Sequence, residues 1–250
     1  MEKQTRTKKS FSWLIFALPA WVFIGFMVAQ LVVVGLAWAL TSMGVPLGDI
    51  NSSLFNTIVA AFIYLLSVVI VIGLPHWMRK STTNRKELGL TRLPSWQDIG
   101  SAPLAFVLYL ITTGIVTYFV ANTVPGFDIN EVQDVGFTGL THQYEYILAF
   151  ITLVILAPVA EEVLFRGYLY GKLKRVVALP IAILVTSALF GAIHGQWNVA
   201  LDTFILSVVL CGLREITGNI WAGILLHMIK NGVAYYFLFI DQSLLNMIGR

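Results

Sequence analysis

Two adjacent carboxylates, Glu161 and Glu162, end a run of residues that is apolar from Ile147 onward. Ionisable side chains inside such a segment are costly to bury and therefore indicate a functional site. Arg166 lies four residues after Glu162, so these two side chains share one face of a helix and can pair. Glu161 is rotated by about 100° from Glu162. The two glutamates need not share a role, because one can pair with Arg166 while the other faces a cavity.

Three more polar side chains, His194, His227 and Asn231, also lie within apolar segments. His227 and Asn231 are four residues apart on one helix face, and both can donate hydrogen bonds. Glu161 and His194 are about equally far from the basic turn that separates their helices. In an antiparallel hairpin this places both at one depth, roughly 24 Å from the turn at 1.5 Å per residue. We expect all four residues to meet in one polar cavity, closer to the cytoplasmic face.

These residue types together provide the parts for attack on an amide bond. A carboxylate beside an imidazole can hold and deprotonate a water molecule. A histidine and an asparagine that donate side by side can stabilise a developing oxyanion. The apolar segments contain no serine in a nucleophile-elbow pattern, and Cys211 has no histidine near it in the sequence. We expect Cys211 to be a small packing residue.

The composition predicts a membrane protein. The chain has 250 residues, of which 58% are hydrophobic and 12% charged, with a mean hydropathy of +0.81; a soluble domain carries roughly 25% charged residues. The fold class that follows is all-α, a polytopic transmembrane helical bundle forming one domain over residues 1–250. A single cysteine excludes an internal disulfide framework. The basic residues lie in short loops, where topology explains them, and nothing indicates a nucleic acid partner.

A spanning helix needs about 20 mostly apolar residues, and about seven spans are predicted. They are Phe11–Leu40, Leu54–Leu74, Pro103–Ala121, Tyr146–Leu173, Leu179–His194, Val199–Leu213 and Gly218–Ile240. The sixth is short and carries Asp202, and its loss would move the C-terminus to the other side of the membrane. The first is too long for a secretory signal and is expected to be an uncleaved helix. A short surface helix near Trp96 is expected to lead into the third.

Basic and non-basic loops alternate along the chain. The loops 41–53 and 122–145 contain no lysine or arginine. The basic residues lie before the first span, in the second loop and in the turn after the fourth span: Lys3, Arg6, Lys8 and Lys9; Arg79, Lys80, Arg85, Lys86 and Arg92; and Lys172, Lys174 and Arg175. Under the positive-inside rule the N-terminus is cytoplasmic, and the polar cavity opens towards that side.

Three motifs carry a resemblance to a known family. EEVLFR at Glu161–Arg166 matches EExxxR, FGAIH at Phe190–His194 matches FxxxH, and HMIKN at His227–Asn231 matches HxxxN. In this order and inside apolar segments, they resemble the CPBP family of type II CAAX prenyl endopeptidases and bacteriocin-processing or bacteriocin-immunity proteins, the Abi group. The resemblance covers about residues 150–232, with KELGL in the second loop as a weaker likeness. It places a protease-like core at residues 144–240.

The resemblance implies intramembrane proteolysis. Carried onto this chain residue by residue, it makes Glu161 the base that activates water and His194 its partner. His227 and Asn231 become the oxyanion donors. The implied substrates are membrane-associated peptides or lipidated proteins. The implied location is the lipid bilayer, and the short loops and small size favour a bacterial plasma membrane.

The need for a metal is open at this point. In one version no cofactor is required, and Glu162 and Arg166 form a structural pair. In the other, Glu161, His194 and His227 bind zinc with one open position, as in catalytic zinc sites. Glu162 would then have to act as the base, which its pairing with Arg166 argues against. We therefore favour the version without a metal.

Two further function classes fit parts of the sequence. A non-proteolytic bacteriocin-immunity protein or regulatory membrane scaffold would keep the same polar residues for packing between helices. A proton-coupled or ion-coupled transporter would also use carboxylates and histidines inside the membrane. The transporter fits less well, because the apparent spans show no repeated halves of the kind that many transporters carry.

Overall fold

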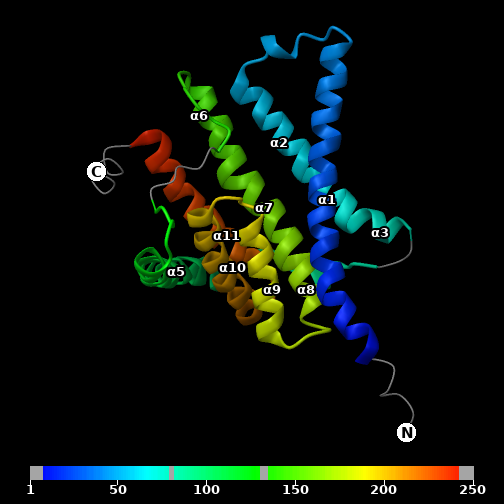
Figure 1. The fold of residues 1–250 in the computed structure, drawn as a ribbon, viewed down its shortest axis with the longest axis vertical. Helices are drawn as coiled ribbons and strands as arrows, with labels where there is room; N and C mark the ends of the chain where they lie inside the picture. Colours follow the sequence, from blue (N-terminus) through cyan, green and yellow to red (C-terminus); the bar gives the residue numbers. More distant parts are fainter. Residues whose placement is uncertain (1–7, 79–81, 130–134, 242–250) are drawn as a thin grey trace.

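The computed structural model describes residues 8–78, 82–129 and 135–241, and the secondary structure of these ranges is all helical (Figure 1). The α-helices are α1 (Lys8–Ser42), α2 (Ser52–Val68), α3 (Leu74–Trp77), α4 (Arg85–Leu88), α5 (Trp96–Thr123), α6 (Gln143–Phe150), α7 (Ala157–Glu162), α8 (Tyr170–Leu173), α9 (Leu179–Ala192), α10 (Trp197–Thr217) and α11 (Trp221–Tyr235). A 3₁₀ turn, η1 (Leu47–Asp49), and four π-helical segments, η2 (Val69–Gly73), η3 (Ile151–Leu156), η4 (Val163–Leu169) and η5 (Tyr236–Ile240), complete them. The predicted all-α class is confirmed.

Within the described ranges, five helices are long and apolar enough to cross a membrane. They are Trp13–Ser42, Ser52–Trp77, Trp96–Thr123, Gln143–Leu173 and Trp221–Ile240. These helices leave large apolar side chains uncovered, such as Trp13 at 70% and Leu104 at 75% exposure. Such exposure is unfavourable in water and favourable against lipid. The prediction of about seven spans is not confirmed.

Three predicted elements differ from the observed ones. The predicted surface helix near Trp96 is the first part of α5, because Ser95 and Asp98 form a capping box that starts the helix there. The predicted fifth span is α9, which has 14 residues and is only about 21 Å long. The predicted sixth span is α10, with 21 residues. It is not among the five candidate spans within the described ranges.

The helices form two groups (Figure 1). The pair α1 and α2 lies beside the continuous rod that runs from α6 to α8. On the other side of this rod, α9, α10 and α11 pack together, and α10 and α11 also pack on α5. The axis of α5 points nearly along the line of sight in Figure 1, so α5 crosses the long helices steeply. The rod is therefore shared by both groups.

The largest buried cluster lies where the rod meets α9 and α10. Its members include Phe165, Leu169, Phe190 and Cys211, each at most 4% exposed. Cys211 is fully buried, so the expectation that it is a packing residue is confirmed. This cluster packs the part of the rod that follows the two glutamates against α9 and α10.

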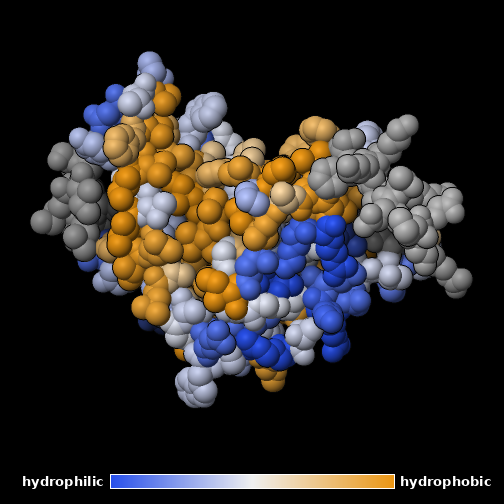
Figure 2. Space-filling view, turned by 90° about the horizontal axis from the view of Figure 1, so that it is seen from below, coloured by the Kyte–Doolittle hydropathy of each residue, from blue (hydrophilic) through white to orange (hydrophobic). Residues whose placement is uncertain are grey.

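The loops predicted to be cytoplasmic meet at one end of the molecule. Glu87 of the second loop pairs with Arg175 at 2.7 Å, and the backbone of Gly89 accepts a hydrogen bond from Ile220. Lys174 pairs with Glu215 at 2.5 Å. Figure 2, which views the molecule from below, shows hydrophilic surface next to broad hydrophobic surface. Four of the basic residues, Lys3, Arg6, Arg79 and Lys80, lie outside the described ranges.

Candidate active site in a polar cavity

Glu161 and Glu162 are the last two residues of α7, within the long rod. Pro158 precedes them, and because proline has no backbone N–H it interrupts the regular helical hydrogen bonds. The segments η3 and η4 on either side of α7 are π-helical. Wider turns of this kind are frequent at functional sites. The sequence therefore places the two carboxylates on a locally irregular stretch of an otherwise rigid helix.

Glu162 and Arg166 form a buried ion pair. The Nη1 atom of Arg166 lies 2.9 Å from Oε1 of Glu162, and both side chains are 0% exposed. The guanidinium also lies over the ring of Phe190, 4.3 Å from its centroid. The ion pair thus links α7 to η4 and packs against Phe190 of α9.

His227 of α11 bridges the two glutamates. Its Nδ1 atom lies 3.1 Å from Oε1 of Glu162, and its Nε2 atom lies 3.8 Å from Oε2 of Glu161. A carboxylate can only accept, so Nδ1 carries the hydrogen in the bond to Glu162. A neutral His227 therefore presents the lone pair of Nε2, and a charged His227 presents a second N–H.

Glu161 has a second partner that comes from α2. The hydroxyl group of Tyr64 donates to Oε1 of Glu161 at 2.9 Å. Gly223 of α11 leaves room for the neighbouring Glu162, because a Cβ atom there would lie 3.0 Å from Oε2 of Glu162. Arg166, Glu162, His227, Glu161 and Tyr64 consequently form one chain of polar contacts.

The four predicted catalytic residues line a single cavity of about 510 Å³, which we call the polar cavity. Its wall is made of Phe26, Gln30, Tyr64, Val135, Leu153, Ala157, Glu161, Ile193, His194, Val199, Thr203, His227, Lys230, Asn231, Ala234, Tyr235 and Leu238. The cavity thus combines a carboxylate, two imidazoles, two amides, an ammonium, two phenols and a threonine hydroxyl among apolar side chains.

His194 and Asn231 are each held by a backbone carbonyl. The Nδ1 atom of His194 lies 2.7 Å from the carbonyl oxygen of Phe190, and Nδ2 of Asn231 donates to the carbonyl of Leu153 at 2.8 Å. A carbonyl only accepts, so Nδ1 of His194 carries a hydrogen, and Nε2 is the ring nitrogen that this bond leaves unused. Asn231 keeps a second amide hydrogen. His194 lies within Coulombic range of Glu161, Lys230 and His227.

The donor types would suit zinc, but their spacing does not. Each histidine donates its Nδ1 hydrogen to a protein acceptor, as zinc ligands usually do. Among the residues that the structure describes, however, no three of His, Cys, Asp or Glu lie close enough to hold a metal ion. The set Glu161, His194 and His227 does not fit a metal in this arrangement.

Sequence reasoning did not identify Tyr64, or Tyr109, whose hydroxyl bonds to Asp202. Asp202 also pairs with Lys230 at 3.2 Å. A tyrosine in an apolar run gives no local indication of its partner, because its hydroxyl can bond across helices that are far apart in the sequence. Asp202 lies on α10 and Lys230 on α11, so the period of a single helix cannot predict that they pair.

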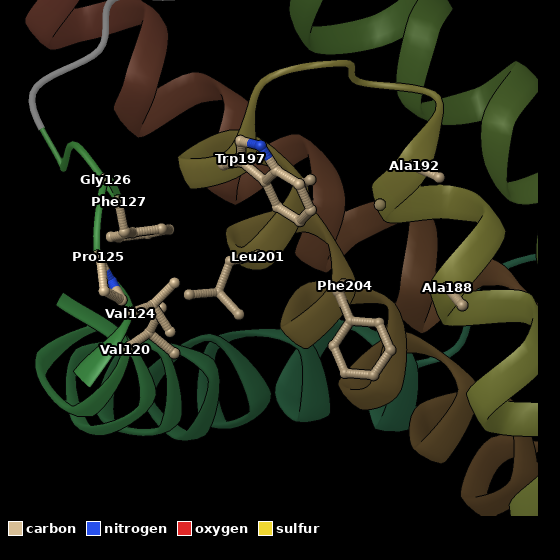
Figure 3. Close-up of a pocket in the computed structure, with 12 residues that line it drawn as sticks. Val120, Val124, Pro125, Gly126, Phe127, Ala188, Ala192, Trp197, Leu201 and Phe204 are labelled. Carbon is tan, nitrogen blue, oxygen red and sulfur yellow. The ribbon is translucent and has the colours of Figure 1, made fainter.

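A second, apolar cavity of about 560 Å³ lies on another side of α10. The polar cavity touches Val199 and Thr203, whereas the apolar one touches Leu201 and Phe204 of the same helix. Figure 3 shows Phe127, Leu201 and Phe204 around this space, with Trp197 at its rim. We call it the apolar groove.

Comparisons with known proteins concern the C-terminal part of the chain. Residues 143–233 match the sequence model of a family described as Type II CAAX prenyl endopeptidase Rce1-like. A curated relative, an uncharacterized 24.3 kDa protein of Escherichia coli, is 33% identical over 89 residues, which are 34% of this chain and 41% of the relative. The chain thus spans less than half of that relative's length. No solved structure shows significant similarity.

Proposed function

We propose that this integral membrane protein is an endopeptidase of CAAX type, since residues 143–233 match the sequence model of the Rce1-like CAAX prenyl endopeptidase family. Its substrates are membrane-associated peptides or lipidated proteins. The single observation that supports this function is the meeting of Glu161, His194, His227 and Asn231 in one polar cavity. Three separate parts of the chain contribute these side chains, namely α7, the turn after α9, and α11.

In the proposed mechanism Glu161 removes a proton from a water molecule, which attacks the carbonyl carbon of the scissile peptide bond. Tyr64 donates to one oxygen of Glu161 and so orients the carboxylate. Nε2 of His194 is the acceptor that can hold the same water. Glu161 then passes its proton to the leaving amine, which restores the carboxylate.

The oxyanion that forms needs hydrogen-bond donors. Asn231 can supply its second amide hydrogen, since only one is used by Leu153. His227 can donate from Nε2 when its ring is doubly protonated, and the carboxylate of Glu162 at Nδ1 balances that charge. Glu162 and Arg166 therefore act in this proposal as a structural pair that positions His227.

The apolar groove supports a lipid-bearing substrate. Its walls are almost entirely carbon, from the end of α5 to α9 and α10, and an isoprenoid chain has the matching chemistry. Ala192 lines the groove, and His194 lines the polar cavity two residues later. The location of the active site towards the cytoplasmic side of a bacterial plasma membrane stays a prediction, because the polar cavity also touches Val135 of the non-basic loop 122–145.

The test is cleavage of an S-farnesylated peptide by purified protein in detergent. Glu161→Gln keeps the size of the side chain and removes the base, so kcat should fall by about 10²–10⁴-fold. Glu215→Gln, at the exposed pair with Lys174, is the matched control and should keep its rate. Full activity in well-folded Glu161→Gln protein would contradict the assignment.

A non-proteolytic immunity or regulatory scaffold is the second candidate. One observation favours it, because Nδ1 of His227 and Nδ2 of Asn231 both make bonds within the protein. In that case the double variant Glu161→Ala and His194→Ala would keep its cellular phenotype at normal protein level. Under the protease proposal the same variant loses the phenotype.

A further inference from the structure

One wall of the polar cavity comes from outside the segment that matches the CAAX-type family. Phe26 and Gln30 of α1 and Tyr64 of α2 line this wall, and all three precede residues 143–233. Phe26 and Gln30 are four residues apart, so they share one face of α1. The proposed chemistry uses Tyr64 and gives Gln30 no role.

Gln30 places an amide in an apolar helix. The span Trp13–Ser42 contains no charged side chain, and Gln30 is its only residue with a side-chain amide. Such an amide usually bonds to a neighbouring membrane helix, but within the described part of the chain Gln30 has no hydrogen-bond partner. Packing between helices therefore does not explain this residue. Its carbonyl oxygen and its two N–H donors are available to a ligand in the cavity.

The helix α1 is held closely against η2, shortly before Gln30. The indole of Trp21 donates to the backbone carbonyl of Val71 at 3.0 Å. Gly25 permits the close approach, because a Cβ atom there would lie 2.5 Å from Cγ2 of Val71. Ala29, next to Gln30, is 0% exposed. These contacts set the rotation of α1, and Gln30 lines the cavity as a result.

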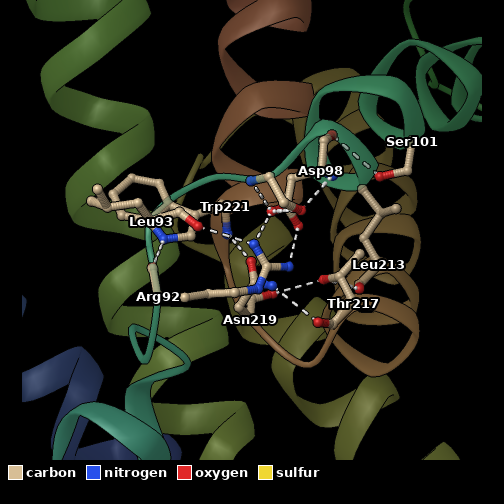
Figure 4. Close-up of polar contacts among 9 residues, drawn as sticks. Arg92, Leu93, Asp98, Ser101, Leu213, Thr217, Asn219 and Trp221 are labelled. Atoms are coloured by element: carbon tan, nitrogen blue, oxygen red, sulfur yellow. Dashed lines mark hydrogen bonds and ion pairs between the residues drawn. The ribbon is translucent and has the colours of Figure 1, made fainter.

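The wall that α11 contributes is anchored at the start of that helix. The indole of Trp221 donates to the backbone carbonyl of Arg92, and Arg92 pairs with Asp98 of α5. Figure 4 shows these contacts between the start of α11 and the segment that leads into α5. The helix that carries His227 is thus fixed by contacts that do not involve α1.

The polar cavity extends beyond the catalytic groups in one direction. On the rod it reaches from Glu161 back to Leu153, about 12 Å at 1.5 Å per residue. On α11 it reaches from His227 to Ala234, about 10 Å. The two stretches lie side by side, because Asn231 donates to the carbonyl of Leu153. An extended peptide advances about 3.3 Å per residue, so about three residues next to the scissile bond fit along this length.

Gln30 lies along the same extension. The ring of Phe26 is beside that of Tyr64, with centroids 6.4 Å apart, and Tyr64 bonds to Glu161. Gln30 follows Phe26 by four residues, a rise of about 6 Å. This rise leads towards α6, since α1 runs from the end near α8 to the end near α6 (Figure 1). The amide is therefore beside the peptide residues that adjoin the bond that is cut.

We propose that the Gln30 amide binds the backbone of an extended peptide substrate within about three residues of the scissile bond. This inference rests on the proposed endopeptidase function and adds a peptide-binding subsite to it. A glutamine offers one acceptor and two donors, which match the N–H and C=O groups of a peptide unit. Hydrogen bonds to the main chain give affinity without selecting side chains, so this contact tolerates different sequences.

The experiment is an ester scan of an S-farnesylated peptide. In each member of the set an ester oxygen replaces one backbone N–H within about three residues of the scissile bond, and the scissile bond itself stays an amide. Loss of the bond to Gln30 should lower kcat/KM of the wild-type protein about tenfold at one position. Gln30→Met keeps the length of the side chain without its amide. It should cleave the parent peptide about tenfold more slowly and show no further loss at that position.

Two variants protect the interpretation. Gln30→Asn keeps an amide but shortens the side chain, so it should give the same result as Gln30→Met if contact with the peptide is the cause. Gln97→Met removes an exposed glutamine of α5 that does not line the polar cavity, and it should give the wild-type scan. An ester scan that is the same in wild-type and Gln30→Met protein would overturn the proposal.

Failure of the subsite and failure of the proposed function give different results. Cleavage with an unchanged scan in Gln30→Met keeps the protease and removes the subsite. If no peptide is cut, the scan is repeated on binding, by fluorescence anisotropy, with analogues that carry a reduced scissile bond. A loss of affinity at one position that is absent in Gln30→Met keeps the subsite without the activity. If no position shows such a loss, the subsite is removed as well.

Discussion

The buried pair of Glu162 and Arg166 gives a quantitative prediction. Its atoms are 2.9 Å apart and both side chains are 0% exposed, so the attraction is about 6 kcal/mol at an effective dielectric constant of about 20. Removing one partner leaves a buried charge without compensation, which typically costs about 3–5 kcal/mol. Arg166→Met should therefore lower the free energy of unfolding by about that amount, although it keeps an unbranched chain against Phe190.

The double variant Glu162→Met and Arg166→Met separates this cause from a general loss of packing. It buries no isolated charge and leaves only Nδ1 of His227 without its acceptor, at a cost of about 1–3 kcal/mol. The double variant should thus be more stable than the sum of the single changes predicts.

The assay is unfolding in mixed micelles with increasing denaturing detergent. Lys174→Met is the matched control, because its pair with Glu215 is 27% and 33% exposed, and its loss should cost less than about 1 kcal/mol. A loss below about 1 kcal/mol in Arg166→Met, or strictly additive effects of the two single changes, would refute the reasoning.

Three further predictions concern the site and its frame. Tyr64→Phe removes the hydrogen bond to Glu161, so kcat should fall about tenfold or more with little change in KM. The control is Tyr235→Phe, which loses a hydrogen bond to a backbone carbonyl at the same cavity. Equal losses of kcat in the two variants would count against a role of Tyr64 in positioning Glu161. Gly191→Ala would place a Cβ atom 2.6 Å from the carbonyl oxygen of Ala200 and should cost about 1–3 kcal/mol of stability, whereas Gly114→Ala, which meets nothing within 4 Å, should be neutral or stabilising. Dialysis against a chelator should leave peptide cleavage intact, and activity that is lost and then restored by zinc would contradict the version without a metal.

Local patterns in the sequence were enough to find the helices and the polar residues within them. The spacing of Glu162 and Arg166 follows from helical geometry alone, so the observed ion pair needed no tertiary information. The number of membrane spans could not be predicted from such local patterns. Where a helix begins depends on its cap, as Ser95 shows for α5, and α9, with 14 residues, is shorter than the about 20 residues that a span needs.

The partners of Glu161 depended on the tertiary structure. The sequence predicted, from equal depth in a hairpin, that His194 lies beside Glu161, and both residues line the polar cavity. However, His227 is the histidine that bridges the two glutamates, and Tyr64 donates a hydrogen bond to Glu161. These contacts join α2, α7 and α11, and their geometry depends on how the helices rotate and cross. No periodicity within one helix contains that information.

By itself, the sequence determined that this is a helical membrane protein and which polar side chains its apolar segments carry, because hydropathy and the 3.6-residue period act locally. It also determined the three motifs that relate residues 143–233 to CAAX-type endopeptidases. Only the tertiary structure decided that Tyr64 touches Glu161 and that Asp202 and Tyr109 hold Lys230 at the cavity wall. Those contacts arise from packing between helices that are distant in the chain, where shape and burial, and not sequence spacing, set which groups meet.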